Sequence, residues 1–216
     1  MDDNSVPSDE ALTNTGLNAA GTGKVLVLGC GALAREIIAV VGANDLSHVS
    51  VHCLPAIYHN HPEKIVPAVE ETVARVGDQY DRIYLAYADC GTGGLLHAAA
   101  DRLGLEMIAG PHCYAFFEGT DGFLDRASDE FTAFYLTDFL VRQFDAFVWR
   151  PLGLDRHPEL RDSYFGHYEK LVYQAQTEDP DLTEKARDCA ARLGLDFERR
   201  FTGYGDLASF LKKIPN

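Results

Sequence analysis

The sequence contains no run of about 18 consecutive apolar residues, which is the length that a membrane-spanning helix requires. Its first residues carry no basic cluster followed by an apolar segment, so they do not resemble a secretory signal. Basic residues are few, with 19 Lys and Arg against 33 Asp and Glu and a formal net charge of -14. Such a field repels polyanions. We therefore expect a cytoplasmic protein that neither spans a membrane nor binds nucleic acid.

Several standard motifs are also missing. No two cysteines are separated by two residues, so the pattern of a structural zinc ribbon is absent. The glycine-rich segment 91–94 lacks the lysine of a P-loop, and Gly29 and Gly31 do not begin a complete G-x-G-x-x-G pattern. These absences disfavour nucleotide binding of the standard kinds. The 5 cysteines are an odd number, which favours free thiols or metal ligands over a disulfide framework.

A chain of 216 residues suits one substantial hydrophobic core. Residues 1–23 are rich in polar residues and show no periodicity, so we expect a flexible N-terminal segment there. Residues 24–216 are expected to form a single α/β domain.

Short apolar runs alternate with helical patterns in the first half. The expected strands are Val25–Leu28, His48–Leu54, Arg82–Ala86 and Met107–Gly110. The expected helices between them are Ala32–Val41, Glu63–Val76 and Leu95–Leu103. This alternation predicts parallel βαβ units, and hence a doubly wound, mostly parallel sheet of about five strands.

The second half has mainly helical spacing. Helices are predicted over Glu130–Phe144, Leu160–Gln176 and Leu182–Leu193, which would add a helical segment to the sheet. A fifth strand is expected at Asp196–Phe201, followed by a closing helix at Tyr204–Lys213.

Three cysteines directly follow predicted strands. Cys30 follows the first strand, Cys90 the third and Cys113 the fourth. In open α/β sheets, ligands bind outside the carboxyl ends of the strands, so these thiols are expected to share one site. Cys53 and Cys189 lie inside a strand and a helix, and for them we favour a packing role.

Three thiolates with an imidazole or an open position match a zinc site, and they equally match a 4Fe-4S cluster that binds substrate. His112, next to Cys113, could be a ligand, a general base or a histidine satisfied by a carbonyl group. His59 and His61 lie on a polar loop after the second strand, and His59 is the better candidate because of its place at the strand end.

A glycine-rich turn, Gly91-Thr92-Gly93-Gly94, leads into a predicted helix. Such a turn can hold a phosphate, a carboxylate or the end of a cofactor. Asp89 just before it could orient a ligand, accept a proton or shape the turn.

Five motifs in one order make the chain similar to a bacterial and archaeal family, domain of unknown function 1638. They are Cys30-Gly-Ala-Leu-Ala-Arg-Glu-Ile, His59-Asn-His-Pro-Glu-Lys-Ile, Asp89-Cys-Gly-Thr-Gly-Gly, Gly110-Pro-His-Cys-Tyr and Leu136-Thr-Asp-Phe-Leu. The resemblance runs from about Lys24 to about Leu207. It implies no assigned activity. The resemblance also leads us to expect that such proteins occur near corrinoid-dependent methyl-transfer systems. The family's Leu-His-Asn-Arg-Pro motif carries over at His59, whereas Tyr58 and His61 replace its Leu and Arg.

The leading hypothesis is a metal-dependent enzyme, such as a transferase or lyase, that acts on a small anionic substrate. Its function would be linked to methyl-group or one-carbon metabolism. Cys30, Cys90 and Cys113 would hold zinc or an iron-sulfur cluster. His112 or His59 would complete the ligand set or move protons, and Asp89 would accept a proton or orient a ligand. One alternative is a non-catalytic accessory protein that binds a metal, a corrinoid or a methyltransferase partner. Another is a metal-free enzyme with a nucleophilic cysteine.

Overall fold

The computed structural model describes residues 7–126 and 130–215. The chain divides into two compact units, and each is described by itself. The first unit comprises Met1–Phe116 with Asp206–Asn216, and the second comprises Phe117–Gly205. The α/β class expected from the sequence is confirmed, because both units contain parallel strands joined by helices. Within the described part of the chain, no helix is both long and apolar enough to cross a membrane.

The first unit is built on a five-stranded sheet with the order β1-β3-β2-β4-β5. The strands are β1 (Leu17–Ala19), β2 (Val25–Cys30), β3 (Val49–Leu54), β4 (Arg82–Ala86) and β5 (Glu106–Met107). All neighbouring pairs are parallel except β1 and β3. Val27 lies opposite both Val51 and Tyr84, so the centre of the sheet is apolar.

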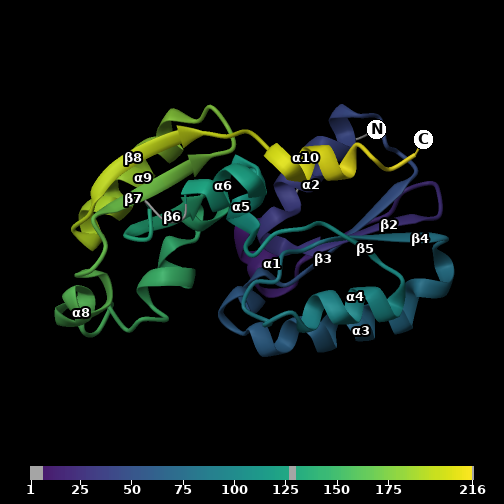
Figure 1. Ribbon diagram of the computed structural model, residues 1–216, viewed down its shortest axis with the longest axis horizontal. Helices are drawn as coiled ribbons and strands as arrows, with labels where there is room; N and C mark the ends of the chain where they lie inside the picture. Colours follow the sequence, from purple (N-terminus) through teal and green to yellow (C-terminus); the bar gives the residue numbers. More distant parts are fainter. Residues whose placement is uncertain (1–6, 127–129, 216) are drawn as a thin grey trace. The chain divides into compact units, whose positions relative to one another are not determined.

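Helices cover both faces of this sheet. The crossover helices are α2 (Ala34–Ala43), α3 (Ile65–Val76) and α4 (Leu95–Leu103), and α10 (Gly205–Leu211) closes the chain. Figure 1 shows α3 and α4 along one face, with α2 and α10 along the other. This double covering explains why β2 is a continuous buried run rather than an alternating one. A Cβ atom at Gly29 would lie 2.7 Å from the Ile37 Cδ1 atom, so the glycine lets α2 approach β2 closely.

The N-terminal segment differs from expectation. Its residues 1–6 lie outside the described part, but α1 (Asp9–Asn14) and β1 are regular elements where a flexible lead-in was predicted. The Ser8 side chain accepts a hydrogen bond from the Ala11 N–H at 3.2 Å, and Leu12 is fully buried. One buried leucine and a capped turn were too short a pattern to register as periodicity.

The second unit contains a three-stranded parallel sheet, ordered β6 (Ala133–Thr137), β7 (Lys170–Ala175) and β8 (Asp196–Phe201). Helix α9 (Pro180–Leu193) packs against β7 and β8 (Figure 1). The strand at Asp196–Phe201 and the helix over 182–193 are confirmed.

Two predicted helices in this unit are wrong. The segments 130–144 and 160–176 contain β6 and β7, each combined with a short helix, α7 (Asp138–Arg142) and α8 (Arg161–Phe165). These strands have only five and six residues and lie next to helices. The spacing of their apolar residues therefore does not distinguish the period of 2 of a strand from the period of 3.6 of a helix. The expectation of a single domain over 24–216 stays a prediction.

Candidate thiol site in the first unit

The three thiols predicted to form a site lie at the carboxyl ends of adjacent strands. Cys30 ends β2, Cys90 follows β4, and Cys113 begins α5 (Cys113–Glu118) after β5. The chain runs outward from β2 to β3 and then crosses back past β2 to β4. The sheet therefore has its topological switch point between β2 and β4, where open α/β sheets bind ligands.

The loops after β4 and β5 are held together by their backbones. The Asp89 N–H donates to the Gly110 carbonyl at 3.3 Å, and the Cys90 N–H donates to the Pro111 carbonyl at 3.1 Å. The segments that follow β4 and β5 therefore remain hydrogen-bonded to each other beyond the end of the sheet. This contact brings Cys90 beside Cys113.

Cys90 and Cys113 form a hydrogen-bonded pair of thiols. The thiol of Cys113 donates to the sulfur of Cys90, and the N–H groups of Cys113 and Ala88 also face that sulfur. These donors stabilise a thiolate, so they hold the pKa of Cys90 below its ordinary value against the opposing effect of burial. The pKa of Cys113 is raised, because its proton is engaged by Cys90 and because it is buried.

Cys30 lies within electrostatic reach of the pair. Burial, followed by the nearby Cys90, raises the pKa of its thiol to about 12. It is 5% exposed, whereas Cys90 is half-buried. The structure therefore brings Cys30, Cys90 and Cys113 into one neighbourhood, with Cys90 as the accessible member.

Cys90 also has an unusual backbone. Its φ angle is 47°, in the left-handed region that residues with a Cβ atom rarely adopt. Such a conformation costs on the order of 1–2 kcal/mol and persists only where the surroundings impose it. Here the two backbone hydrogen bonds to the 110–111 loop hold this conformation, which directs the Cys90 side chain toward Cys113.

Tyr87 lies beneath the thiols and was missed at the sequence level. It is 1% exposed, and its hydroxyl has no hydrogen bond of acceptable geometry within the described residues. The hydroxyl makes only a weak donor contact with the Cys30 sulfur. Burial, the largest cause, and all three thiols raise the pKa of Tyr87. Its position directly after β4, at the edge of the sheet where ligands bind, could have identified it from the sequence.

The glycine turn is already filled by a side chain of its own loop. Asp89 accepts hydrogen bonds from the Thr92 hydroxyl at 2.7 Å, the Gly93 N–H at 3.0 Å and the Gly94 N–H at 2.7 Å. These bonds outweigh partial burial and hold the pKa of Asp89 below its ordinary value. The Thr92 hydroxyl and the Gly93 and Gly94 N–H groups are thus engaged within the loop, and the binding of an external anion by Gly91, Thr92, Gly93 and Gly94 stays a prediction. Asp89 shapes the turn.

Two of the predicted histidines lie near each other. Burial lowers the pKa of His59, and the neighbouring His112 lowers it further. Burial also lowers the pKa of His112, against the opposing charge of Asp89. The His112 ring stacks on Tyr114 with 4.9 Å between the ring centroids. Both histidines are therefore neutral imidazoles near neutral pH, able to accept a proton or bind a metal.

The remaining candidates lie apart from this group. His61 is 47% exposed and pairs with Glu63 at 3.4 Å, so nothing places it in the site. Cys53 is fully buried inside β3, and Cys189 is buried in α9 of the second unit, as packing residues would be.

Two polar side chains near the site were not foreseen. His97, on the first turn of α4, lies 3.9 Å from Asp89. Glu36 is 3% exposed in α2, and its charge contributes to the raised pKa values of Cys30 and Cys53. An acidic residue in the buried face of an apolar helix was the signal for Glu36.

Together, the fold and the site define an α/β protein with a buried thiol cluster at its topological switch point. Comparison of the sequence with family models then shows that the chain belongs to the family described as "Protein of unknown function (DUF1638)", which matches residues 53–211. The matched segment includes His59, Cys90 and Cys113 but begins after Cys30. No curated protein and no solved structure matches the chain.

Proposed function

We propose that Cys30, Cys90 and Cys113 are the ligands of a metal centre, zinc or an iron-sulfur cluster, in an enzyme that acts on a small anionic substrate. The observation that carries this proposal is the convergence of three thiols from three strand ends at the switch point of the sheet. Soft thiolate ligands select zinc and iron-sulfur clusters, and three protein ligands leave a position open for substrate or water.

The thiols need to move to bind a metal. As they stand, no three or more His, Cys, Asp or Glu side chains of the described residues are placed to hold a metal ion. A cysteine has one side-chain torsion, and rotation about it redirects the sulfur without moving the backbone. The buried Tyr87 hydroxyl, which lacks a well-formed hydrogen bond, is suited to donate to a metal-bound thiolate.

The histidines have a defined place in this proposal. His112 and His59 would complete the ligand set or move protons, and each is held neutral by burial. Zinc would activate water or a thiol, whereas an iron-sulfur cluster would supply Lewis-acid or redox chemistry. Methyl-group or one-carbon chemistry as the reaction type rests on family resemblance.

The test is metal and sulfide analysis of protein purified without oxygen. We expect about one zinc or about four irons per chain. Cys30→Ser, Cys90→Ser and Cys113→Ser should each lose this metal, while the matched controls Cys53→Ser and Cys189→Ser should keep it. Retention of full metal by the first three variants would contradict the proposal.

The pH dependence of metal binding provides a second test. Cys30 and Cys113 have raised pKa values and are protonated near neutral pH. Metal binding must displace these protons, so the affinity should rise with pH and protons should be released on binding. A pH-independent affinity would mean that the metal binds elsewhere.

A second candidate function is nucleophilic catalysis by Cys90 beside His112. The lowered pKa of the half-buried Cys90 favours it, because a thiolate is the attacking species. In this case only Cys90→Ser would be inactive among the three serine variants, and no metal would be found. A third possibility is an accessory protein that delivers a metal or corrinoid to a methyltransferase partner. Such a protein would exchange its metal readily and would show no catalytic turnover, which distinguishes it from both enzymes.

A further inference from the structure

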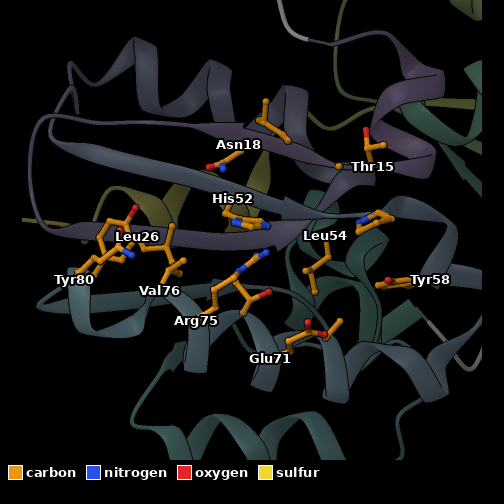
Figure 2. Close-up of a pocket in the computed structure, with 16 residues that line it drawn as sticks. Thr15, Asn18, Leu26, His52, Leu54, Tyr58, Glu71, Arg75, Val76 and Tyr80 are labelled. Carbon is orange, nitrogen blue, oxygen red and sulfur yellow. The ribbon is translucent and has the colours of Figure 1, made fainter.

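The first unit also contains a cavity that none of the three thiols lines. It has a volume of about 750 Å³ and lies between α3 and the sheet edge formed by β1 and β3. Figure 2 shows side chains from both sides pointing into it. A volume of this size suits a small organic molecule.

Two nitrogen-bearing side chains face each other in this cavity. Arg75 of α3 points toward His52 of β3 (Figure 2). The two are close enough for the Arg75 charge to add to the lowering of the His52 pKa, which is due mainly to burial. Neither side chain has a hydrogen-bond or ion-pair partner in the part of the chain that the structure describes. Asn18 pairs with His52 across β1 and β3 and adds a third polar group.

Among the described residues Arg75 forms no ion pair, although an acidic residue lies one turn away. Glu71 precedes it by four residues on α3, a spacing at which Glu and Arg ordinarily pair. In the described structure they remain apart, and both line the cavity. The cationic end of the cavity is therefore open to an external anion.

The rest of the lining is mixed in polarity. Leu26, Leu54 and Val76 supply apolar surface, and Tyr58 and Tyr80 supply ring faces (Figure 2). The exposed lining is more polar than apolar, which suits a charged ligand with a small carbon skeleton.

We propose that this cavity binds a small organic monocarboxylate. Its carboxylate pairs with Arg75 and His52, because a guanidinium group matches carboxylate geometry with two parallel N–H donors. Its carbon skeleton lies against the apolar wall. The Glu71 charge disfavours a second negative group, so a monocarboxylate binds better than a dicarboxylate. This inference is independent of the metal centre.

The test is calorimetric titration of the full chain with three probes, namely benzoate, succinate and the neutral benzyl alcohol. We expect saturable binding of benzoate, with succinate and benzyl alcohol at least tenfold weaker. Arg75→Gln should weaken benzoate binding at least tenfold, and His52→Gln should weaken it severalfold. The matched control Arg156→Gln removes the same charge from a side chain that is 75% exposed in the second unit, and should leave the affinity unchanged.

Either of two results would overturn the proposal. One is the absence of saturable benzoate binding to the wild-type protein. The other is equal affinity in the wild-type and Arg75→Gln proteins, with circular dichroism showing that both are folded. Cys30→Ser should bind benzoate normally, so failure of the metal proposal and failure of this one are distinguishable.

Discussion

Replacing Tyr87 with Phe should stabilise the metal-free protein. The Tyr87 hydroxyl is buried and has no well-formed hydrogen bond with any residue that the structure describes, and a buried polar group in that state costs about 1–3 kcal/mol. The weak donor contact of the hydroxyl with the Cys30 sulfur recovers part of this cost, so we expect a net gain of about 1 kcal/mol in the free energy of unfolding. For a chain of this size, that gain raises Tm by about 2–4 °C.

A matched control exists at another fully buried tyrosine. The Tyr173 hydroxyl donates to the Asp138 carboxylate at 2.7 Å, a hydrogen bond to a charged group. Tyr173→Phe should therefore destabilise the protein by about 1.5–3 kcal/mol. The assay is urea and thermal unfolding of both variants under reducing conditions with a chelator present. Destabilisation by Tyr87→Phe as large as that of Tyr173→Phe would refute the reasoning, because it would show that Tyr87 is well partnered.

Three further outcomes follow from the pKa shifts and hydrogen bonds. In metal-free protein, iodoacetamide should modify Cys90 before Cys30, because the Cys90 pKa is lowered and its side chain is accessible; peptide mass mapping that found Cys30 first would refute this. Asp89→Ala should cost about 1–2 kcal/mol, because it removes the acceptor of three hydrogen bonds in the loop, and the advantage of wild type over Asp89→Asn should shrink progressively as pH falls below about 4. An advantage that stayed constant as pH fell further would contradict this. Hydrogen bonds, chiefly from Arg200, lower the Glu130 pKa to about 2, so the stability that Glu130→Gln loses at pH 7 should shrink as pH falls from 4.5 toward 2, measured by urea unfolding. An unchanged difference over that range would argue against the ion pair.

The central strands of the first unit, β2, β3 and β4, could be predicted because they are buried on both faces and end in glycine or polar turns. Val25–Leu28 and Arg82–Ala86 are short, continuous and flanked by clear turn residues. Parallel strands place their carboxyl ends at one edge, so the neighbourhood of Cys30, Cys90 and Cys113 followed without any motif library.

The second unit was harder to predict for a physical reason. Strand β6 leads directly into α7 through Thr137, whose side chain accepts a hydrogen bond from Leu140 at 3.4 Å. The apolar residues of a strand and a helix joined without a loop blend into one helix-like pattern. Only pairing with β7 shows that 133–137 is extended, and strand pairing is a long-range property.

The internal hydrogen bonds of the glycine turn could not be predicted, because a sequence shows donors but not their acceptors. Gly93 and Gly94 carry the free N–H groups that an anion needs, and the acceptor is Asp89 of the same loop. Tyr87 shows the reverse case, since its unsatisfied state becomes visible only once its surroundings are known.

X-ray absorption spectroscopy of the metal-loaded protein tests the central proposal most directly, because it counts the ligand atoms around the metal. If Cys30, Cys90 and Cys113 are the ligands, zinc-loaded protein should show three sulfur atoms at about 2.3 Å and one lighter ligand at about 2.0 Å. Cys90→Ser should lower the sulfur count by one. A shell of nitrogen and oxygen alone, or a sulfur count unchanged in Cys90→Ser, would contradict the proposed thiol centre.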